Sequence, residues 1–296
     1  MGTRILGIAG HKQSGKSTLS NFIHGYQLRA HHTIDGFKIT QQGELVVDTA
    51  LIDSEGNETQ GQGIIDPKRQ DVEFAEWAAY SMWPFVKSYS FASTLKEIAI
   101  GLFGIKHEQV YGGEGQKNSY TWFKWEDMPG IVTKKSLLTK AGIKTLIADG
   151  TLQFHKPGKM TAREFLQFFG TDICRKIYSE IWQVKIINDI TREGSLLAIV
   201  DDCRFPNEVE SIQNAGGKVI YLQRNIHSDT HSSECSLDNY ESFDAIIDNS
   251  NMTIHETSIA IIEQFDKWGW LGKEIATTSE PNKEVFSGIH TIKEKD

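Results

Sequence analysis

Residues 4–17 of the chain read RILGIAGHKQSGKS, and this stretch decides the fold. Its first half is a short apolar run that suits a buried strand, and a glycine-rich turn follows it. Apolar side chains at Leu19, Phe22 and Ile23 then recur with the period of a helix. A buried strand, a glycine-rich turn and a helix in this order favour a sheet with helices packed on it.

The turn matches the pattern GxxxxGK[ST] from Gly10 to Ser17. Its glycines let backbone amides point at phosphate oxygens near the positive end of the following helix. The lysine of this motif reaches the β and γ phosphates, and its serine offers a hydroxyl to Mg²⁺. The motif therefore predicts ATP or GTP with Mg²⁺, held through Ser17. The expected nucleotide-binding residues are Gly10, Lys12, Ser14, Gly15, Lys16, Ser17 and Thr18.

Four further apolar runs predict strands, and helical patterns separate them. The runs span residues 88–92, 196–200, 218–222 and 243–247. Because they lack the polar alternation of half-exposed strands, they suit a parallel sheet covered on both faces. Helical patterns return from residue 161 to residue 190. The predicted fold is α/β: a P-loop NTPase three-layer fold with a mainly parallel sheet.

Two stretches interrupt this pattern. Residues 31–70 alternate between apolar and polar side chains and contain turn pairs, which predicts inserted β-hairpins with a peripheral role. Residues 106–129 are rich in Gly, Tyr and Trp without a clear period, and a loop-rich insertion is predicted over residues 106–160. One domain of residues 1–270 is expected to contain both, with a polar tail over 271–296.

The composition limits the partners. The chain has 31 basic and 39 acidic residues, a net charge of −8, so stable binding to nucleic acid is not expected. No apolar run could span a bilayer, and the first residues do not read as a secretory signal. Cys174, Cys203 and Cys235 fit free thiols in a reducing compartment. The cytoplasm is the expected location.

A small acidic chain with this loop fits a kinase that acts on a small acceptor. Such an enzyme must hold the acceptor in line and spread the developing charge, for which the planar fork of Arg is well suited. Three segments supply cations for this work: Ser90–Glu97 with Lys96, Thr161–Asp172 with Arg163, and Asp201–Glu208 with Arg204.

In order, these motifs resemble those of the bacteriophage deoxynucleoside monophosphate kinases. The shared pattern includes the phosphate loop, a strand followed by Lys96, and R-x-x-x-Q-x-x-GTD ending at Asp172. It continues through Trp182, a D-x-R-x-x-x-E run from Asp202 and a loop at residues 229–231. The resemblance covers most of residues 4–30 and 86–266. Both predicted insertions lie largely outside it, and the 106–160 insertion is expected on the acceptor side.

The resemblance implies transfer of the γ-phosphoryl group of ATP, with Mg²⁺, to a deoxynucleoside 5′-monophosphate. It implies catalytic roles for Lys16, Arg163 and Arg204. The implied acceptor-binding residues are Lys96, Arg163, Gly170, Thr171, Trp182, Asp202, Arg204 and Glu208, and the implied lid residues are Thr230 and His231. If a phage encodes the chain, its location is the host cytoplasm. Association into a homodimer is left open.

Ordinary structural roles stay open for several of these side chains. Arg163 could brace its helix, Trp182 could pack in the core, Asp202 could sit at a helix N-terminus, and Lys96 could be a solvated helix residue. Two other functions stay open as well. One is a P-loop kinase acting on a hydroxyl of a modified base in DNA or of a small metabolite. The other is a nucleotide-gated binding or assembly protein.

Overall fold

The computed structural model describes residues 2–52, 58–69, 71–224 and 236–271. The chain forms two compact units: unit 1 is Met1–Phe91 with Gln183–Asp296, and unit 2 is Ala92–Trp182. The predicted lid residues Thr230 and His231, Cys235 and the polar tail beyond Leu271 lie outside the described residues. Within the described ranges, no helix is both long enough and apolar enough to cross a membrane.

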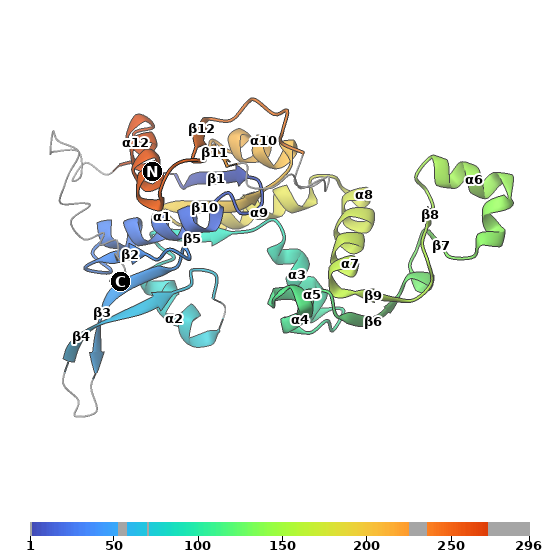
Figure 1. The fold of residues 1–296 in the computed structure, drawn as a ribbon, viewed down its shortest axis with the longest axis horizontal. Helices are drawn as coiled ribbons and strands as arrows, with labels where there is room; N and C mark the ends of the chain where they lie inside the picture. Colours follow the sequence, from blue (N-terminus) through green and yellow to red (C-terminus); the bar gives the residue numbers. More distant parts are fainter. Residues whose placement is uncertain (1, 53–57, 70, 225–235, 272–296) are drawn as a thin grey trace. The chain divides into compact units, whose positions relative to one another are not determined.

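Unit 1 is built on a five-stranded sheet in the order β12-β11-β1-β10-β5 (Figure 1). Its strands are β1 (Arg4–Gly10), β5 (Val86–Tyr89), β10 (Leu197–Cys203), β11 (Lys218–Gln223) and β12 (Ala245–Asp248). Every pairing in this sheet is parallel, so the carboxyl ends of the strands meet at one edge. The predicted α/β fold with a parallel central sheet is confirmed.

Helices cover both faces of this sheet. They are α1 (Lys16–Ala30), α9 (Ile181–Glu193), α10 (Pro206–Asn214) and α12 (Ile254–Lys267). Alternate residues of β1 point to opposite faces. Leu6 and Ile8 are fully buried in the core that α1 and α12 share. Gly7 faces α10, where an added Cβ would lie 2.9 Å from the side chain of Ile212. The absence of a side chain at this position lets α10 pack closely on the strand.

The segment predicted as hairpins forms a second, antiparallel sheet in unit 1. It consists of β2 (Phe37–Ile39), β3 (Leu45–Ile52) and β4 (Glu58–Ile65), followed by α2 (Val72–Ser81). Phe37 and Leu45 are buried in the same core as α1. Asn21 of α1 also donates a hydrogen bond to the carbonyl of Gly43, 2.8 Å away. The interpretation of these hairpins as peripheral was therefore wrong, because they cover α1 and complete its core.

Unit 2 contains many short elements. Its helices are α3 (Ser93–Gly101), α4 (His107–Tyr111), α5 (Glu114–Lys117), α6 (Ala141–Ala148), α7 (Ala162–Gln167) and α8 (Arg175–Ile177), with 3₁₀ turns at Trp125–Asp127 and Lys135–Thr139. Its strands are β6 (Tyr120–Lys124), β7 (Ile131–Val132), β8 (Gln153–Phe154) and β9 (Lys159–Thr161). The stretch predicted as loop-rich thus contains regular elements and shares a core with α3 and α7, in which Phe123, Met160 and Phe165 are buried.

The helical patterns predicted over residues 161–190 correspond to several helical segments separated by breaks. After α7 the chain forms a π-helical stretch, Phe168–Cys174, and then the short helix α8. Residues 178–180 are not helical, and α9 begins after them. The apolar period continues across these breaks, so the pattern alone does not show where each helix ends.

Replacing a buried side chain of the inserted sheet should destabilise unit 1. Leu45 is fully buried, so Leu45→Ala should lower the free energy of unfolding by about 2–5 kcal/mol. Ile64 on the same sheet is 65% exposed, and Ile64→Ala should change it by less than about 0.5 kcal/mol. Urea unfolding measures both, and equal effects of the two substitutions would show that the sheet is peripheral after all.

Candidate functional site

The phosphate loop joins β1 to α1 through two glycines in left-handed conformations. Gly10 has a φ of 142° and Gly15 a φ of 98°, values that side chains rarely allow. A Cβ on Gly10 would lie 2.7 Å from the carbonyl oxygen of Leu222 on the neighbouring strand. The glycine pattern in the sequence therefore has a direct steric cause.

Lys16 lies at the start of α1 and bends back over the loop. Its ammonium donates hydrogen bonds to the carbonyls of Gly10 and His11, each 2.6 Å away. Ser14 is fully buried inside the loop, and its hydroxyl has no hydrogen-bond partner among the described residues. The loop thus brings a positive charge and an unsatisfied hydroxyl to a helix N-terminus, a combination that suits a bound phosphate.

Two contacts hold this loop from distant parts of unit 1. Asn249, directly after β12, is 3% exposed and donates from its amide to the carbonyl of Ser14 at 2.9 Å. His11 pairs through Nε2 with Asp238 at 3.0 Å. Neither contact was predicted from the sequence, because each joins residues that are remote along the chain.

Asp202 lies near the carboxyl end of β10 in unit 1. Its carboxylate accepts hydrogen bonds from the hydroxyl of Ser90 at 2.6 Å and from the N–H of Phe91 at 3.2 Å. Burial raises the pKa of Asp202, while the Ser90 hydrogen bond opposes the shift. These contacts join β10 to the residues that follow β5. Asp202 therefore has a different structural role from the helix N-terminal one left open above.

Glu208 and Arg204 stand at the start of α10. Glu208 is 2% exposed, and its carboxylate accepts from the N–H groups of Arg204 and Phe205 at 2.9 and 3.2 Å. Glu208 therefore caps the helix, a role that was not expected from the sequence. The side chain of Arg204 is exposed. A role of either residue toward an acceptor stays a prediction.

In unit 2, the two predicted acceptor cations have partners. Arg163, on α7, contacts Glu114 of α5 through Nη2 at 2.8 Å, and the Arg163 side chain is 39% exposed. The ammonium of Lys96 on α3 lies 4.7 Å from the centre of the Tyr111 ring. Arg163 thus does brace two helices of the unit, as one of the open alternatives had it, and its guanidinium remains accessible.

Gly170 and Trp182 meet within unit 2. The carbonyl of Gly170 accepts a hydrogen bond from Nε1 of Trp182 at 3.3 Å, and Trp182 is 5% exposed. A Cβ on Gly170 would lie 2.7 Å from Leu95 of α3, so the glycine allows close packing. Thr171 beside it is exposed. Trp182 therefore packs in the core, the open alternative for this residue, and its role toward a nucleotide stays a prediction.

The predicted residues divide between the two units. Unit 1 holds the phosphate loop together with Asp202, Arg204 and Glu208, and unit 2 holds Lys96, Arg163, Gly170, Thr171 and Trp182. The Ser17 side chain is exposed near the N-terminus of α1, a position that fits a magnesium ligand. Within the described ranges, no group of three or more His, Cys, Asp or Glu side chains could hold a metal.

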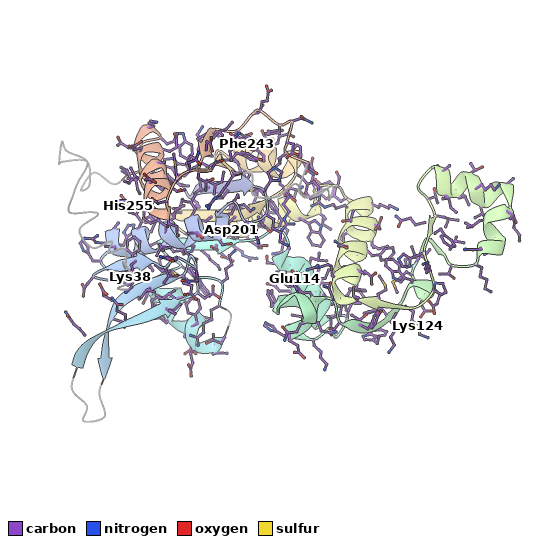
Figure 2. The ribbon with its side chains drawn as sticks, viewed as in Figure 1. Lys38, Glu114, Lys124, Asp201, Phe243 and His255 are labelled. Atoms are coloured by element: carbon purple, nitrogen blue, oxygen red, sulfur yellow. The ribbon has the colours of Figure 1, made fainter. Side chains whose placement is uncertain are left out.

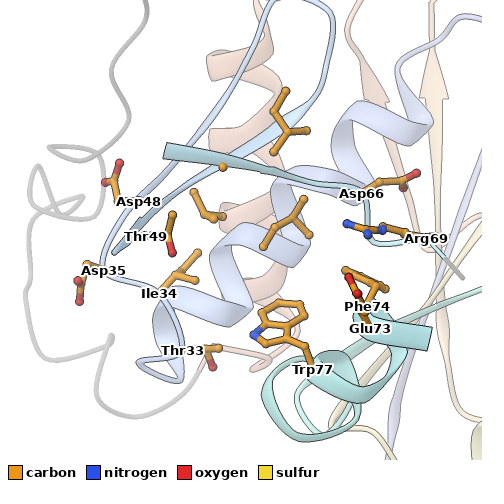
Figure 3. A pocket seen from close by; sticks show the side chains of 14 residues that line it. Thr33, Ile34, Asp35, Asp48, Thr49, Asp66, Arg69, Glu73, Phe74 and Trp77 are labelled. Atoms are coloured by element: carbon orange, nitrogen blue, oxygen red, sulfur yellow. The ribbon is translucent and has the colours of Figure 1, made fainter. Parts of the chain in front are cut away.

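A cavity of about 490 Å³ opens in unit 1 between the inserted sheet and α2 (Figure 3). Trp77 and Phe74 line its α2 side. Its charged lining consists of Asp35, Asp48, Asp66, Glu73 and Arg69. Four carboxylates against one guanidinium would repel a nucleotide phosphate, so the cavity does not suit the acceptor of a kinase.

Comparisons with known proteins agree with the resemblance found in the motifs. Residues 125–258 match the family model described as deoxynucleotide monophosphate kinase. The chain is also 26% identical, over 181 residues, to a protein of Acanthamoeba polyphaga mimivirus named as a candidate deoxynucleotide monophosphate kinase. That match covers 60% of this chain and 81% of the viral protein. The predicted resemblance and the predicted enzyme class, a phosphotransferase, are thereby confirmed.

Removal of the Asn249 amide should loosen the phosphate loop. Asn249→Ala deprives the buried Ser14 carbonyl of its donor, which should lower the free energy of unfolding by about 1–3 kcal/mol. Nucleotide affinity should fall with it, because the loop is held less firmly. Titration with a fluorescent ATP analogue measures the affinity, and Asn251→Ala, at an exposed position nearby, is the control. An unchanged affinity in Asn249→Ala would contradict this role.

Proposed function

We propose that the protein transfers the γ-phosphoryl group of ATP, with Mg²⁺, to a deoxynucleoside 5′-monophosphate, giving the diphosphate and ADP. The observation that carries the proposal is the geometry of the phosphate loop, where Lys16 curls over two loop carbonyls. The family match adds to it, since residues 125–258 include Arg163, Trp182 and Arg204.

On the donor side, the work of this chain is to position charge. The Lys16 ammonium can exchange its two carbonyl partners for the oxygens of the β and γ phosphates, where negative charge develops during transfer. The hydroxyl of Ser17 would hold Mg²⁺, which when bound would offset part of the negative charge of the phosphates. The positive end of α1 supports the same phosphates. None of these steps needs a nucleophilic side chain.

On the acceptor side, Arg163 and Lys96 are the proposed phosphate ligands. The contact between Arg163 and Glu114 is solvent-exposed, and such a pair contributes only roughly 0–1 kcal/mol. An acceptor phosphate carries about two negative charges at neutral pH and can take both arms of the guanidinium. A monophosphate can therefore displace the carboxylate of Glu114 at little cost.

The proposed reaction also implies a location and a set of partners for the protein. The protein would work in the cytoplasm on free nucleotides, without a membrane or a stable nucleic-acid partner, and a homodimer stays open. The relative comes from a giant virus, so a bacteriophage origin stays a prediction. A kinase for a hydroxyl acceptor would gain little from an arginine phosphate clamp. A nucleotide-gated assembly protein would release phosphate from ATP without any acceptor.

The proposed reaction is tested by offering labelled ATP to a mixture of acceptors. Deoxynucleoside monophosphates compete in one tube with single- and double-stranded DNA, and label is expected in diphosphates alone. Lys16→Ala should leave the fold intact and lower the transfer rate by about two orders of magnitude or more, because a charge stabiliser is lost. Label in the polymer, free phosphate as the sole product, or full turnover of a folded Lys16→Ala variant would each contradict the proposal.

Substitution of the clamp arginine should affect the acceptor and spare the donor. Arg163→Lys keeps the positive charge and loses the fork, so the KM for the monophosphate should rise on the order of tenfold while the KM for ATP stays the same. Steady-state kinetics with each substrate varied in turn measures the split. Arg192→Lys is the matched control, since Arg192 is an ion-paired arginine of α9 in unit 1. Equal effects of the two substitutions would remove Arg163 from the acceptor site.

A further inference from the structure

The inserted segment delivers a lysine to the carboxyl end of the central sheet. Lys68 follows β4 in the chain, and its ammonium lies 2.6 Å from Oδ2 of Asp201 on β10. The Asp201 side chain is 2% exposed, whereas that of Lys68 is 48% exposed. Figure 2 labels Asp201, which belongs to unit 1. A solvated cation thus covers a carboxylate that the strand buries.

Burial of Asp201 demands such a partner. A carboxylate removed from water is costly unless an opposite charge or hydrogen bonds compensate it. His24 of α1 is near Asp201, but it is fully buried and its pKa is lowered to about 4, so at neutral pH it is uncharged. The compensating charge therefore comes from the inserted segment and not from α1.

The neighbour of Asp201 is Asp202, the predicted acceptor residue. Asp202 fixes the turn after β5 through Ser90 and Phe91, and it can accept both hydrogen bonds fully only when ionised. Burial raises its pKa first, Asp201 raises it further, and Lys68 lowers it. The other titratable groups around the two carboxylates are His24 from α1, Asp66 after β4, Cys203 on β10 and Glu208 from α10.

We infer that Lys68 is a positioning residue for phosphoryl transfer: it neutralises the buried Asp201, so that Asp202 keeps its hold on the Ser90–Phe91 turn at the carboxyl end of the sheet. Lys68 acts through Asp201 and need not touch a substrate. The inference rests on the proposed function. It gives the inserted sheet a part in the chemistry besides its part in the core.

A cycle of substitutions at the pair tests this role. Lys68→Met should lower kcat on the order of tenfold and move the acid limb of the pH–kcat profile upward by about one pH unit, because Asp202 then ionises less readily. Lys68→Arg keeps the charge and should restore most of the activity. The double variant Lys68→Met with Asp201→Asn should also recover, because Asp201, the carboxylate that Lys68 neutralises, is then replaced by an uncharged amide.

The control is a partly exposed ion pair at the amino ends of β11 and β12. Lys218 begins β11 and contacts Asp244 at 2.7 Å, with Lys218 40% and Asp244 14% exposed. Lys218→Met should leave kcat and the pH profile unchanged. Thermal unfolding of every variant separates a loss of fold from a loss of rate.

Several results would overturn the proposed role of Lys68. A double variant as impaired as Lys68→Met would show that Lys68 acts on the substrate itself, which overturns the inference. So would a Lys68→Met variant that is only less stable, with kcat and pH profile unchanged. A wild-type protein that phosphorylates no deoxynucleoside monophosphate would overturn the proposed function and this inference with it. Wild-type activity without rescue in the double variant would overturn this inference alone.

Discussion

The carbonyl oxygen of Leu222 on β11 comes so close to Gly10 that no side chain fits between them. This contact forces the chain to leave β1 through glycine, and the loop that results points its carbonyls at Lys16. Because β12 pairs with β11 in parallel, Asn249, directly after β12, lies at the same carboxyl end of the sheet as Leu222. Asn249 holds the loop by donating a hydrogen bond to the carbonyl of Ser14. The phosphate loop is therefore shaped by strands that lie far from it in sequence.

Much of the fold was predictable because the deciding signals are local. A strand buried on both faces reads as a continuous apolar run, and the five runs recognised in the sequence correspond to the five strands of the central sheet. The phosphate loop is equally local, since its eight positions are consecutive. The site contacts are not: Lys68 and Asp201 are 133 residues apart, and Ser14 and Asn249 are 235 apart. No periodicity in a single sequence reveals such pairs.

Unit 2 was harder to predict for a different reason. Its elements are mostly too short for a period to show, and its core depends on aromatic side chains such as Phe123 and Phe165, which stack on each other. The π-helical stretch is a further case. There the carbonyl of Gly170 accepts from the N–H of Arg175 and from Trp182, and this arrangement depends on packing against Leu95, which lies outside the local pattern.

The inserted sheet links stability to chemistry within unit 1. Phe37 and Leu45 bury themselves against α1, the helix that begins at Lys16, while Lys68 of the same segment covers Asp201 at the end of β10. The inserted sheet therefore supports both the phosphate loop, which follows β1, and Asp201, which lies on β10. The inserted segment interrupts the recognised motifs, and the sequence therefore indicated that it could be removed. In the structure it packs into the hydrophobic core through Phe37 and Leu45, and Lys68 pairs with the buried Asp201. Its loss would expose apolar surface and leave a carboxylate uncompensated, and both changes would destabilise the unit that contains the phosphate loop.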